Sequence, residues 1–159
     1  MIDRRTLLAG GGAALAGTLL FGRSTDAVAA RFEVTKTPAE WRRQLGPQRY
    51  RILREAGTER AYTSPLNKEH RRGRFACAGC ANPLFASTTK FESGTGWPSF
   101  YRALPKAVLT KTDRTFGMER TEVLCARCGG HLGHLFRDGP RPTGLRYCMN
   151  GLALRFQPA

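Results

Sequence analysis

The sequence predicts a mainly β fold of the α+β class, in which a short helical segment precedes an antiparallel β body. Two observations support this prediction. A helix-capping pattern begins at Thr37, and the helical signals stop at Gly57. Beyond Gly57 the chain consists of short apolar or alternating pieces separated by Gly, Pro and Asn, which is the pattern of strands joined by turns.

The helical segment opens with a capping box. Thr37 stands at the N-cap, Pro38 at the first helical position, and Glu40 is placed to bond back to the N-cap backbone. Apolar residues then recur at helical spacing until Gly46-Pro47 interrupts them. We therefore expect two short helices that meet at this break.

Five pieces of the remaining chain have the composition of strands. They cover residues 74–77, 90–92, 107–112, 120–125 and 152–156. No internal repeat, low-complexity tract or linker divides residues 30–159, so this part of the chain is predicted to form one domain.

The first 29 residues have the features of a twin-arginine export signal that is cleaved. Arg4 and Arg5 precede an uncharged stretch, residues 6–22, that is rich in Ala, Gly and Leu. Ala27-Val28-Ala29 offers the small residues that a signal peptidase requires. The alternative is a membrane anchor, but the apolar run is shorter than the roughly 20 residues that span a bilayer core. We therefore predict a periplasmic or otherwise exported protein, membrane-anchored only if the signal stays uncleaved.

The chain carries a formal net charge of +14. Such a surplus favours nucleic acid, anionic lipid and acidic proteins alike, so it identifies no partner by itself. The basic residues are scattered along the sequence instead of forming one stripe. This distribution favours a solvated cationic surface, and we expect no nucleic-acid partner.

Four of the five cysteines form two C-x-x-C pairs, Cys77/Cys80 and Cys125/Cys128. Four thiolates presented on two tight turns can complete a tetrahedral shell around one structural Zn²⁺. Two disulfides, a redox-active C-x-x-C pair and a rubredoxin-like iron site are the alternatives. The spacing between the pairs exceeds that of a zinc ribbon, so we expect distant hairpins that the fold brings together.

The fifth cysteine, Cys148, needs its own explanation. It follows Arg146 by two residues, and His131 and His134 lie a short way upstream. Neighbouring positive charge favours a thiolate, which makes a cysteine nucleophilic. Taken alone, however, a solitary cysteine beside an apolar strand is more often an inert core residue.

At this point the chain resembles a known family, the type B peptide-methionine (R)-S-oxide reductases, over nearly all of residues 30–159. Six sequence blocks, in the family's order and spacing, carry the resemblance: Gly57-Thr-Glu-Arg60, Cys77-Ala-Gly-Cys80, Ser93-Gly-Thr-Gly-Trp-Pro-Ser-Phe100, Arg120-Thr-Glu-Val123, His131-Leu-Gly-His134 and Gly144-Leu-Arg-Tyr-Cys-Met-Asn150. The resemblance implies two antiparallel sheets with an N-terminal helical segment. It also implies a zinc ion on the four paired cysteines, away from the active site.

The resemblance further implies catalytic roles. The Cys148 thiolate would attack the sulfoxide sulfur of methionine-R-sulfoxide in a peptide and end as a sulfenic acid. A sulfoxide oxygen leaves only when protonated, so His131 or His134 would act as the acid, and Asn150 would orient the oxygen or a water. The positions implied for substrate binding are Trp97, Arg146 and Phe100.

One departure from the family pattern affects recycling of the nucleophile. Many family members carry a second cysteine at the position of Thr95. We therefore predict that an external thiol, from a thioredoxin-like protein or a small molecule, reduces oxidised Cys148. The partners are then oxidised proteins or peptides and this reductant, and we expect a monomer. A four-cysteine iron electron carrier and a basic zinc-binding interaction module are the alternative functions.

Overall fold

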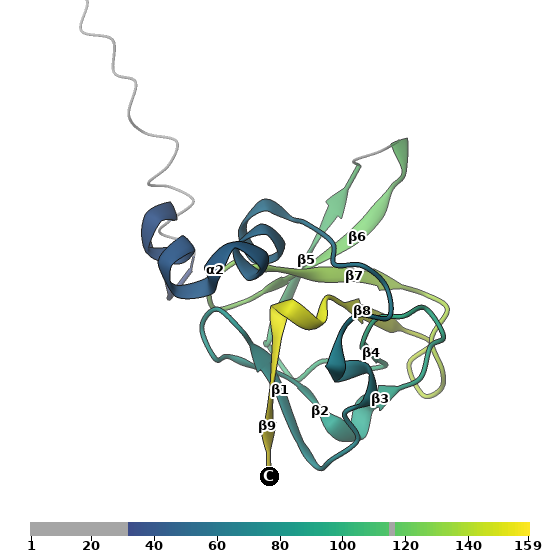
Figure 1. The fold of residues 1–159 in the computed structure, drawn as a ribbon. Coiled ribbons are helices and arrows are strands. Elements are labelled where there is room, and N and C mark those ends of the chain that lie inside the picture. The colour runs from purple at the N-terminus through teal and green to yellow at the C-terminus, as the bar shows by residue number, and fades with distance from the viewer. Residues whose placement is uncertain (1–31, 115–116) are drawn as a thin grey trace, which may run out of the picture.

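Two antiparallel β-sheets and one kinked α-helix make up residues 32–114 and 117–159, the part of the chain that the computed structural model describes (Figure 1). This arrangement confirms the predicted fold class. The predicted export signal lies outside the described residues. Within them, no helix has the length and apolar character needed to cross a membrane.

The smaller sheet has three strands in the order β2-β1-β9, namely Pro83–Ala86, Gly73–Cys77 and Leu154–Pro158. The larger sheet has the order β3-β4-β8-β7-β6-β5. Its strands are Lys90–Phe91, Ser99–Phe100, Arg146–Met149, His131–Phe136, Arg120–Cys125 and Val108–Asp113. All neighbouring strands are antiparallel. This order places β8 and β7 in the middle of the larger sheet.

Helix α2 spans Pro38–Glu55 and has the predicted capping box. Thr37 Oγ1 accepts a hydrogen bond from the Glu40 backbone N–H, and the Glu40 carboxylate accepts one from the Thr37 N–H at 2.8 Å. Gly46 adopts φ 68° and ψ 171°, which is non-helical, so the predicted break divides α2 into two helical pieces. The helix ends at Glu55, before the predicted end at Gly57, because Ala56 already takes the left-handed conformation.

The core lies between the sheets and beneath α2. Trp41, Ile52 and Leu53 are buried on the inner face of α2, which packs against β7 and the 3-10 turn Gly151–Ala153. Between the sheets, three phenylalanines form an aromatic cluster: Phe85 stacks on Phe100 at 4.3 Å between ring centroids, and Phe75 meets Phe100 edge-on at 4.9 Å.

All five predicted strands overlap observed ones. The prediction for 120–125 coincides with β6, and that for 152–156 runs too early because Gly151–Ala153 form a 3-10 turn before β9. Four strands were not predicted, namely β2, β4, β7 and β8. Two of these, β7 and β8, carry the histidines and the fifth cysteine.

Candidate active site and metal centre

The four paired cysteines converge at one place in the fold. All four sulfur atoms lie within 4.8 Å of one another. The distance from Cys77 Sγ to Cys128 Sγ is 3.8 Å, and that from Cys80 Sγ to Cys125 Sγ is 3.6 Å. A disulfide requires about 2.05 Å between sulfurs, so the four thiols are free and arranged as a cluster. Their positions suit one metal ion.

Two turns of the same design present these cysteines. Each follows a strand, β1 or β6, whose last residue is the first cysteine of the pair. The residue after the second cysteine, Ala81 or Gly129, takes a positive φ, 59° or 67°. Its N–H bonds to the carbonyl of the first cysteine, at 2.9 Å in one turn and 2.8 Å in the other. The repeated turn explains why both pairs need the C-x-x-C spacing.

The four sulfurs of the cluster interact strongly with one another. Hydrogen bonding from Cys128 lowers the pKa of Cys125, whereas hydrogen bonding to Cys125 raises the pKa of Cys77. The thiols therefore share protons, since four thiolates so close together repel one another. A bound cation would remove this repulsion and ionise all four groups. The donor set and its spacing fit a four-thiolate metal site.

Cys148 lies at the centre of the larger sheet, on β8. Antiparallel pairing sets it directly opposite His134 on β7 and Ser99 on β4. Directly opposite residues project from the same face of a sheet, so the sulfur and the imidazole are neighbours. Gly133 permits this approach, because a Cβ at that position would lie 2.1 Å from the Cys148 carbonyl oxygen.

A β-bulge brings both histidines to one face of β7. In a regular strand, residues three apart project from opposite faces. Here Val123 pairs with Gly133 but Leu124 pairs with His131, so Leu132 is an extra residue. The two imidazole rings consequently lie 5.5 Å apart between centroids.

Each histidine is held by a carboxylate. His131 Nδ1 lies 2.7 Å from Glu122 Oε1, and His134 Nε2 lies 2.9 Å from Asp113 Oδ2. Burial lowers the pKa of His134, although the hydrogen bond to Asp113 opposes this shift. His131 is 4% exposed, and its Nε2 is buried without a hydrogen-bond partner in the described part of the chain.

A small cleft of about 130 Å³ opens over Cys148. The residues that line it are Thr58, Trp97, Arg120, Gly133, His134, Phe136, Cys148 and Asn150. His134 faces the cleft directly, whereas His131 lies behind it. Trp97 and Phe136 supply apolar walls. The cleft therefore combines a thiol, an imidazole and two aromatic rings.

The loop at Thr58-Glu59 holds the cleft together. The Glu59 carbonyl accepts a hydrogen bond from Trp97 Nε1 at 3.1 Å, and the Glu59 N–H donates to Asn150 Oδ1 at 3.0 Å. Asn150 Nδ2 in turn donates to the Leu132 carbonyl at 3.2 Å. Both ends of the Asn150 amide are thus occupied, and its observed role is to tie this loop to the bulge in β7.

Arg146 lies on the same strand as Cys148, two residues away, but outside the residues that line the cleft. Its guanidinium forms two hydrogen bonds to Asp138, at 2.8 and 2.7 Å, and lies over the Phe136 ring at 4.3 Å. Asp138 raises the pKa of Arg146, and Cys148 contributes to the same shift. Arg146 therefore fixes the Phe136 wall and places positive charge near the sulfur.

Phe100 is fully buried in the aromatic cluster and does not line the cleft. It was predicted to bind substrate, but a side chain with no exposed surface is not available to a substrate in this cleft. Its strand pairs with β8 at Tyr147, and its ring points into the core. We assign Phe100 to the core that supports β8.

Thr95 stands where the resemblance implied a possible second cysteine. Its Oγ1 lies 3.7 Å from Cys148 Sγ, within reach of a hydrogen bond to sulfur. The Ser93 hydroxyl lies 2.8 Å from Thr95 Oγ1 and 2.7 Å from Ser99 Oγ. A chain of three hydroxyls therefore ends at the Cys148 sulfur.

This combination of a lone thiol, a paired imidazole and a separate four-cysteine cluster can be compared with known proteins. The SelR domain model matches residues 45–158, more than half of the chain. The chain belongs to the SelR-domain family.

Three relatives show how far this SelR domain resembles other proteins. A protein of Thiobacillus denitrificans named peptide methionine sulfoxide reductase MsrB is 60% identical over 77% of this chain and 94% of its own length. Proteins of the same name from Leptospira interrogans and Methanosarcina barkeri are 55% and 49% identical, over 79% and 80% of this chain. The alignments include 97% of the Leptospira protein and 91% of the Methanosarcina protein.

Several functional positions of the SelR domain were missed at the sequence level. Phe136 forms a wall of the cleft, Glu59 fastens Trp97 and Asn150, and Asp113 and Glu122 hold the histidines. The acidic partners come from β5 and β6, two hairpin strands whose register with β7 is not readable from one sequence. Glu59 and Glu122 lie within the sequence blocks that carry the family resemblance, and this location was the signal that could have identified them.

Proposed function

We propose that this SelR domain reduces methionine-R-sulfoxide in peptides to methionine, with Cys148 as the nucleophile. The observation that carries the proposal is the direct pairing of Cys148 with His134 across β8 and β7, beneath a cleft walled by Trp97 and Phe136. The names of the relatives support the same activity.

The proposed reaction transfers two electrons from the cysteine sulfur to the sulfoxide sulfur. The Cys148 thiolate attacks the sulfoxide sulfur, the oxygen takes up one proton, and the resulting hydroxyl passes to the cysteine sulfur as the S–O bond of the sulfoxide breaks. Methionine leaves and Cys148 becomes a sulfenic acid. Arg146 lies two residues from Cys148 on β8, and the Thr95 hydroxyl lies 3.7 Å from its sulfur.

His134 is the better candidate for the proton donor. It lines the cleft, whereas His131 is buried behind it. Asp113 holds His134 through Nε2, so the opposite nitrogen, Nδ1, makes no hydrogen bond to the described residues and is the atom available to the sulfoxide oxygen. Asp113 also stabilises the charged imidazolium, which offsets the effect of burial. His131 supports the ring of its neighbour.

The two aromatic walls explain a preference for one epimer. A sulfoxide sulfur carries an oxygen, a methyl group and the peptide arm, and each must meet a different wall. If the oxygen faces His134, the methyl group of only one epimer rests against Trp97 and Phe136. The proposal is tested by turnover with dithiothreitol on matched peptides of the two epimers. We expect reduction of the R epimer at least about a hundredfold faster than the S epimer. Equal rates, or reduction of the S epimer alone, would rule the proposal out.

Regeneration of Cys148 needs a thiol from outside this chain. The four other cysteines form the metal cluster and do not line the cleft. Two external thiols would convert the sulfenic acid back to a thiol, releasing one water and one disulfide. A thioredoxin-like protein and a small thiol both meet this chemical requirement.

Replacing Thr95 by cysteine should supply the missing internal thiol. The Thr95 oxygen lies 3.7 Å from Cys148 Sγ, so small rotations would bring a sulfur there to bonding distance. After one turnover without reductant, we expect mass spectrometry to find an intramolecular disulfide between Cys148 and the introduced cysteine. Thr95→Ser, which keeps the hydroxyl, should leave the sulfenic acid unpaired. Failure of the cysteine variant to form the disulfide would contradict the observed proximity.

We propose zinc as the metal of the four-cysteine site. Tetrahedral zinc–thiolate bonds of about 2.3 Å would hold the sulfurs about 3.8 Å apart, close to the separations of 3.6 and 3.8 Å given above. Iron accepts the same ligands but would give visible absorption, so elemental analysis and an absorption spectrum distinguish the two. Detection of one iron and no zinc would refute this assignment.

We also propose that the protein works outside the cytoplasm. The support is the Arg4-Arg5 pair before an uncharged stretch, with small residues at 27–29. A folded, metal-loaded domain suits the twin-arginine route, which carries folded proteins, and repair of oxidised exported proteins would follow. Replacing both arginines by lysine should retain the protein in the cytoplasmic fraction; unchanged export would exclude this route. The expectations of a monomer and of no nucleic-acid partner stay predictions.

A further inference from the structure

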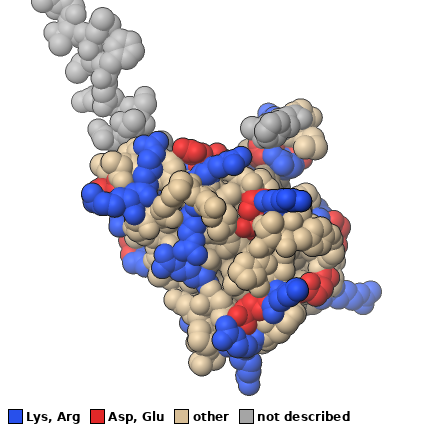
Figure 2. Space-filling view, viewed as in Figure 1, with Lys and Arg blue, Asp and Glu red and all other residues tan. Residues whose placement is uncertain are grey.

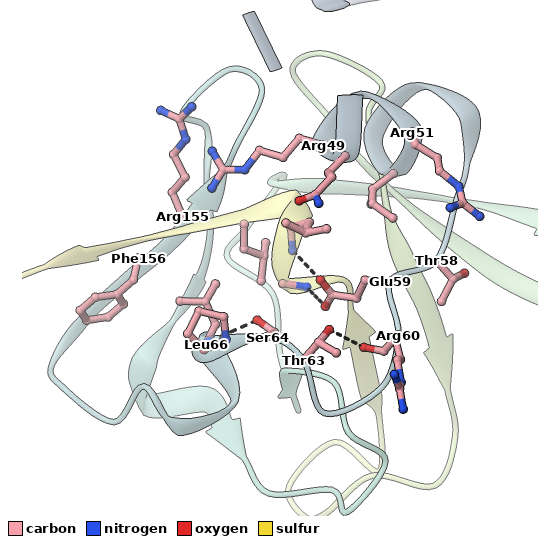
Figure 3. Close-up of a pocket in the computed structure, with 16 residues that line it drawn as sticks. Arg49, Arg51, Thr58, Glu59, Arg60, Thr63, Ser64, Leu66, Arg155 and Phe156 are labelled. Atoms are coloured by element: carbon pink, nitrogen blue, oxygen red, sulfur yellow. Dashed lines mark hydrogen bonds between the residues drawn. The ribbon is translucent and has the colours of Figure 1, made fainter. Parts of the chain in front are cut away.

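A second and larger cleft, of about 660 Å³, lies beside the first (Figure 3). Helix α2, the loop after it and the C-terminal segment form its walls. Its floor is partly apolar, with Ile52, Leu66, Leu152 and Leu154 among the lining residues. Its rim carries four arginines: Arg49, Arg51, Arg60 and Arg155. We call it the arginine cleft.

The positive charge of the arginine cleft is not neutralised by the protein. Within residues 32–114 and 117–159, none of its four arginines forms a salt bridge, whereas Arg71, Arg127 and Arg146 each have a carboxylate partner. Its one acidic lining residue, Glu59, is buried. The Glu59 carboxylate accepts hydrogen bonds from the backbone N–H groups of Gly151 and Leu152, as Figure 3 shows.

The arginines lie on two sides of the arginine cleft. In Figure 3, the Arg49 side chain extends toward Arg155 at one end, whereas Arg51 and Arg60 lie above and below Thr58 at the other end, apart from each other. Partial burial and the charge of Arg155 lower the pKa of Arg49. Two like charges that face each other without a counter-ion form a site for an anion. Elsewhere on the face shown in Figure 2, basic side chains are scattered, several of them beside acidic ones.

The arginine cleft adjoins the cleft over Cys148. Thr58 lines both. Asn150 lines the Cys148 cleft, and the next residue, Gly151, lines the arginine cleft. A chain segment that places one side chain at Cys148 therefore has the arginine cleft beside it, on the other side of Thr58.

We propose that the arginine cleft binds an acidic stretch of the same protein whose oxidised methionine occupies the Cys148 cleft. This inference rests on the proposed function and adds a preference for substrates with Asp or Glu near the sulfoxide. A peptide suits the site better than a small anion, because the arginines lie at two ends of a cleft of about 660 Å³ whose lining also includes apolar side chains.

The test compares peptides that carry one methionine-R-sulfoxide and differ only in their flanking residues. One set has Asp and Glu at positions up to six residues before or after the sulfoxide, a second has Ser and Gln, and a third has Lys. With dithiothreitol at low salt, we expect kcat/KM for the best acidic peptide to exceed that for the neutral one by about fivefold to tenfold. The advantage should shrink as salt screens it.

Two double variants locate the effect. Arg49→Gln with Arg155→Gln, and separately Arg51→Gln with Arg60→Gln, should each reduce the acidic advantage while leaving kcat/KM for the neutral peptide unchanged. Arg43→Gln is the matched control, because Arg43 lies on α2 but does not line the arginine cleft. Melting temperatures show whether each variant is folded, and two independent pairs keep the test valid if one pair unfolds.

Three outcomes would overturn the inference. The first is equal kcat/KM for acidic and neutral peptides while the neutral peptide is still reduced. The second is an acidic preference that survives in both double variants. The third is stronger binding, dependent on these arginines, to phosphatidylglycerol vesicles or single-stranded DNA than to the acidic peptide.

Failure of the proposed function would look different, because no peptide would then be reduced. Binding of a fluorescent acidic peptide with unoxidised methionine, followed by anisotropy, tests the arginine cleft independently of turnover. We expect affinity to fall at least fivefold in each double variant and not in Arg43→Gln. Unchanged affinity in both double variants would overturn the inference by itself.

Discussion

Cys148→Ser is expected to lower the rate of methionine-R-sulfoxide reduction at least about a thousandfold. A serine hydroxyl at this position is not ionised at neutral pH and does not replace the thiolate as a nucleophile toward sulfur. Steady-state assays with dithiothreitol measure the effect. The loss should appear in kcat, because Trp97 and Phe136, the walls proposed to bind the substrate, are unchanged.

The fold should survive this substitution. Cys148 is half-buried at the cleft, and its sulfur lies 3.7 Å from Thr95 Oγ1, a contact that a serine hydroxyl can also make. Melting temperature and metal content should therefore match those of the unchanged protein. A serine variant that is folded, metal-loaded and still active would remove Cys148 from the reaction.

Cys128→Ser is expected to have the opposite pattern, with loss of metal and of the folded state. Cys128 is buried, and its carbonyl also accepts a hydrogen bond from Arg54 of α2 at 2.9 Å. Structural zinc in a thiolate site contributes on the order of 10 kcal/mol, which is comparable to the whole stability of a typical domain. We expect the variant to be insoluble or to melt far below the unchanged protein.

Metal removal from the unchanged protein provides the control for this prediction. A strong chelator should lower the melting temperature in the same direction, and added zinc should restore it. Activity should fall only as the fold is lost, because the metal cluster and the Cys148 cleft share no lining residue. A Cys128→Ser variant with unchanged melting temperature would show that the cluster does not stabilise the fold.

The parts of the fold that follow from local rules were predictable. The capping box at Thr37 and the Gly46 break describe α2 almost residue by residue, since both depend on neighbours in sequence. Strand β7 was not predicted, because the bulge at Leu132 and the glycine at 133 disrupt the alternation that marks a strand. Strand β4 has two residues and was too short to detect.

The site shows the same difference between features set by local sequence and features set by the tertiary fold. C-x-x-C spacing predicted the metal ligands, because the spacing itself builds the turn. Cys148, His134 and Trp97, which the resemblance implied as site residues, line one cleft, whereas Phe100 is buried in the core. The carboxylates of Asp113 and Glu122 meet the histidines only through the register of β5, β6 and β7. Such contacts depend on how the strands are paired, which is a property of the tertiary fold.

In the proposed reaction, Cys148 itself takes the oxygen from methionine-R-sulfoxide. The most direct measurement is a single turnover without reductant, in which released methionine is counted and Cys148 is labelled with a reagent specific for sulfenic acid. We expect one methionine per protein molecule and the label on Cys148 alone. Methionine formed without any change at Cys148, or label on one of the four clustered cysteines, would contradict the account.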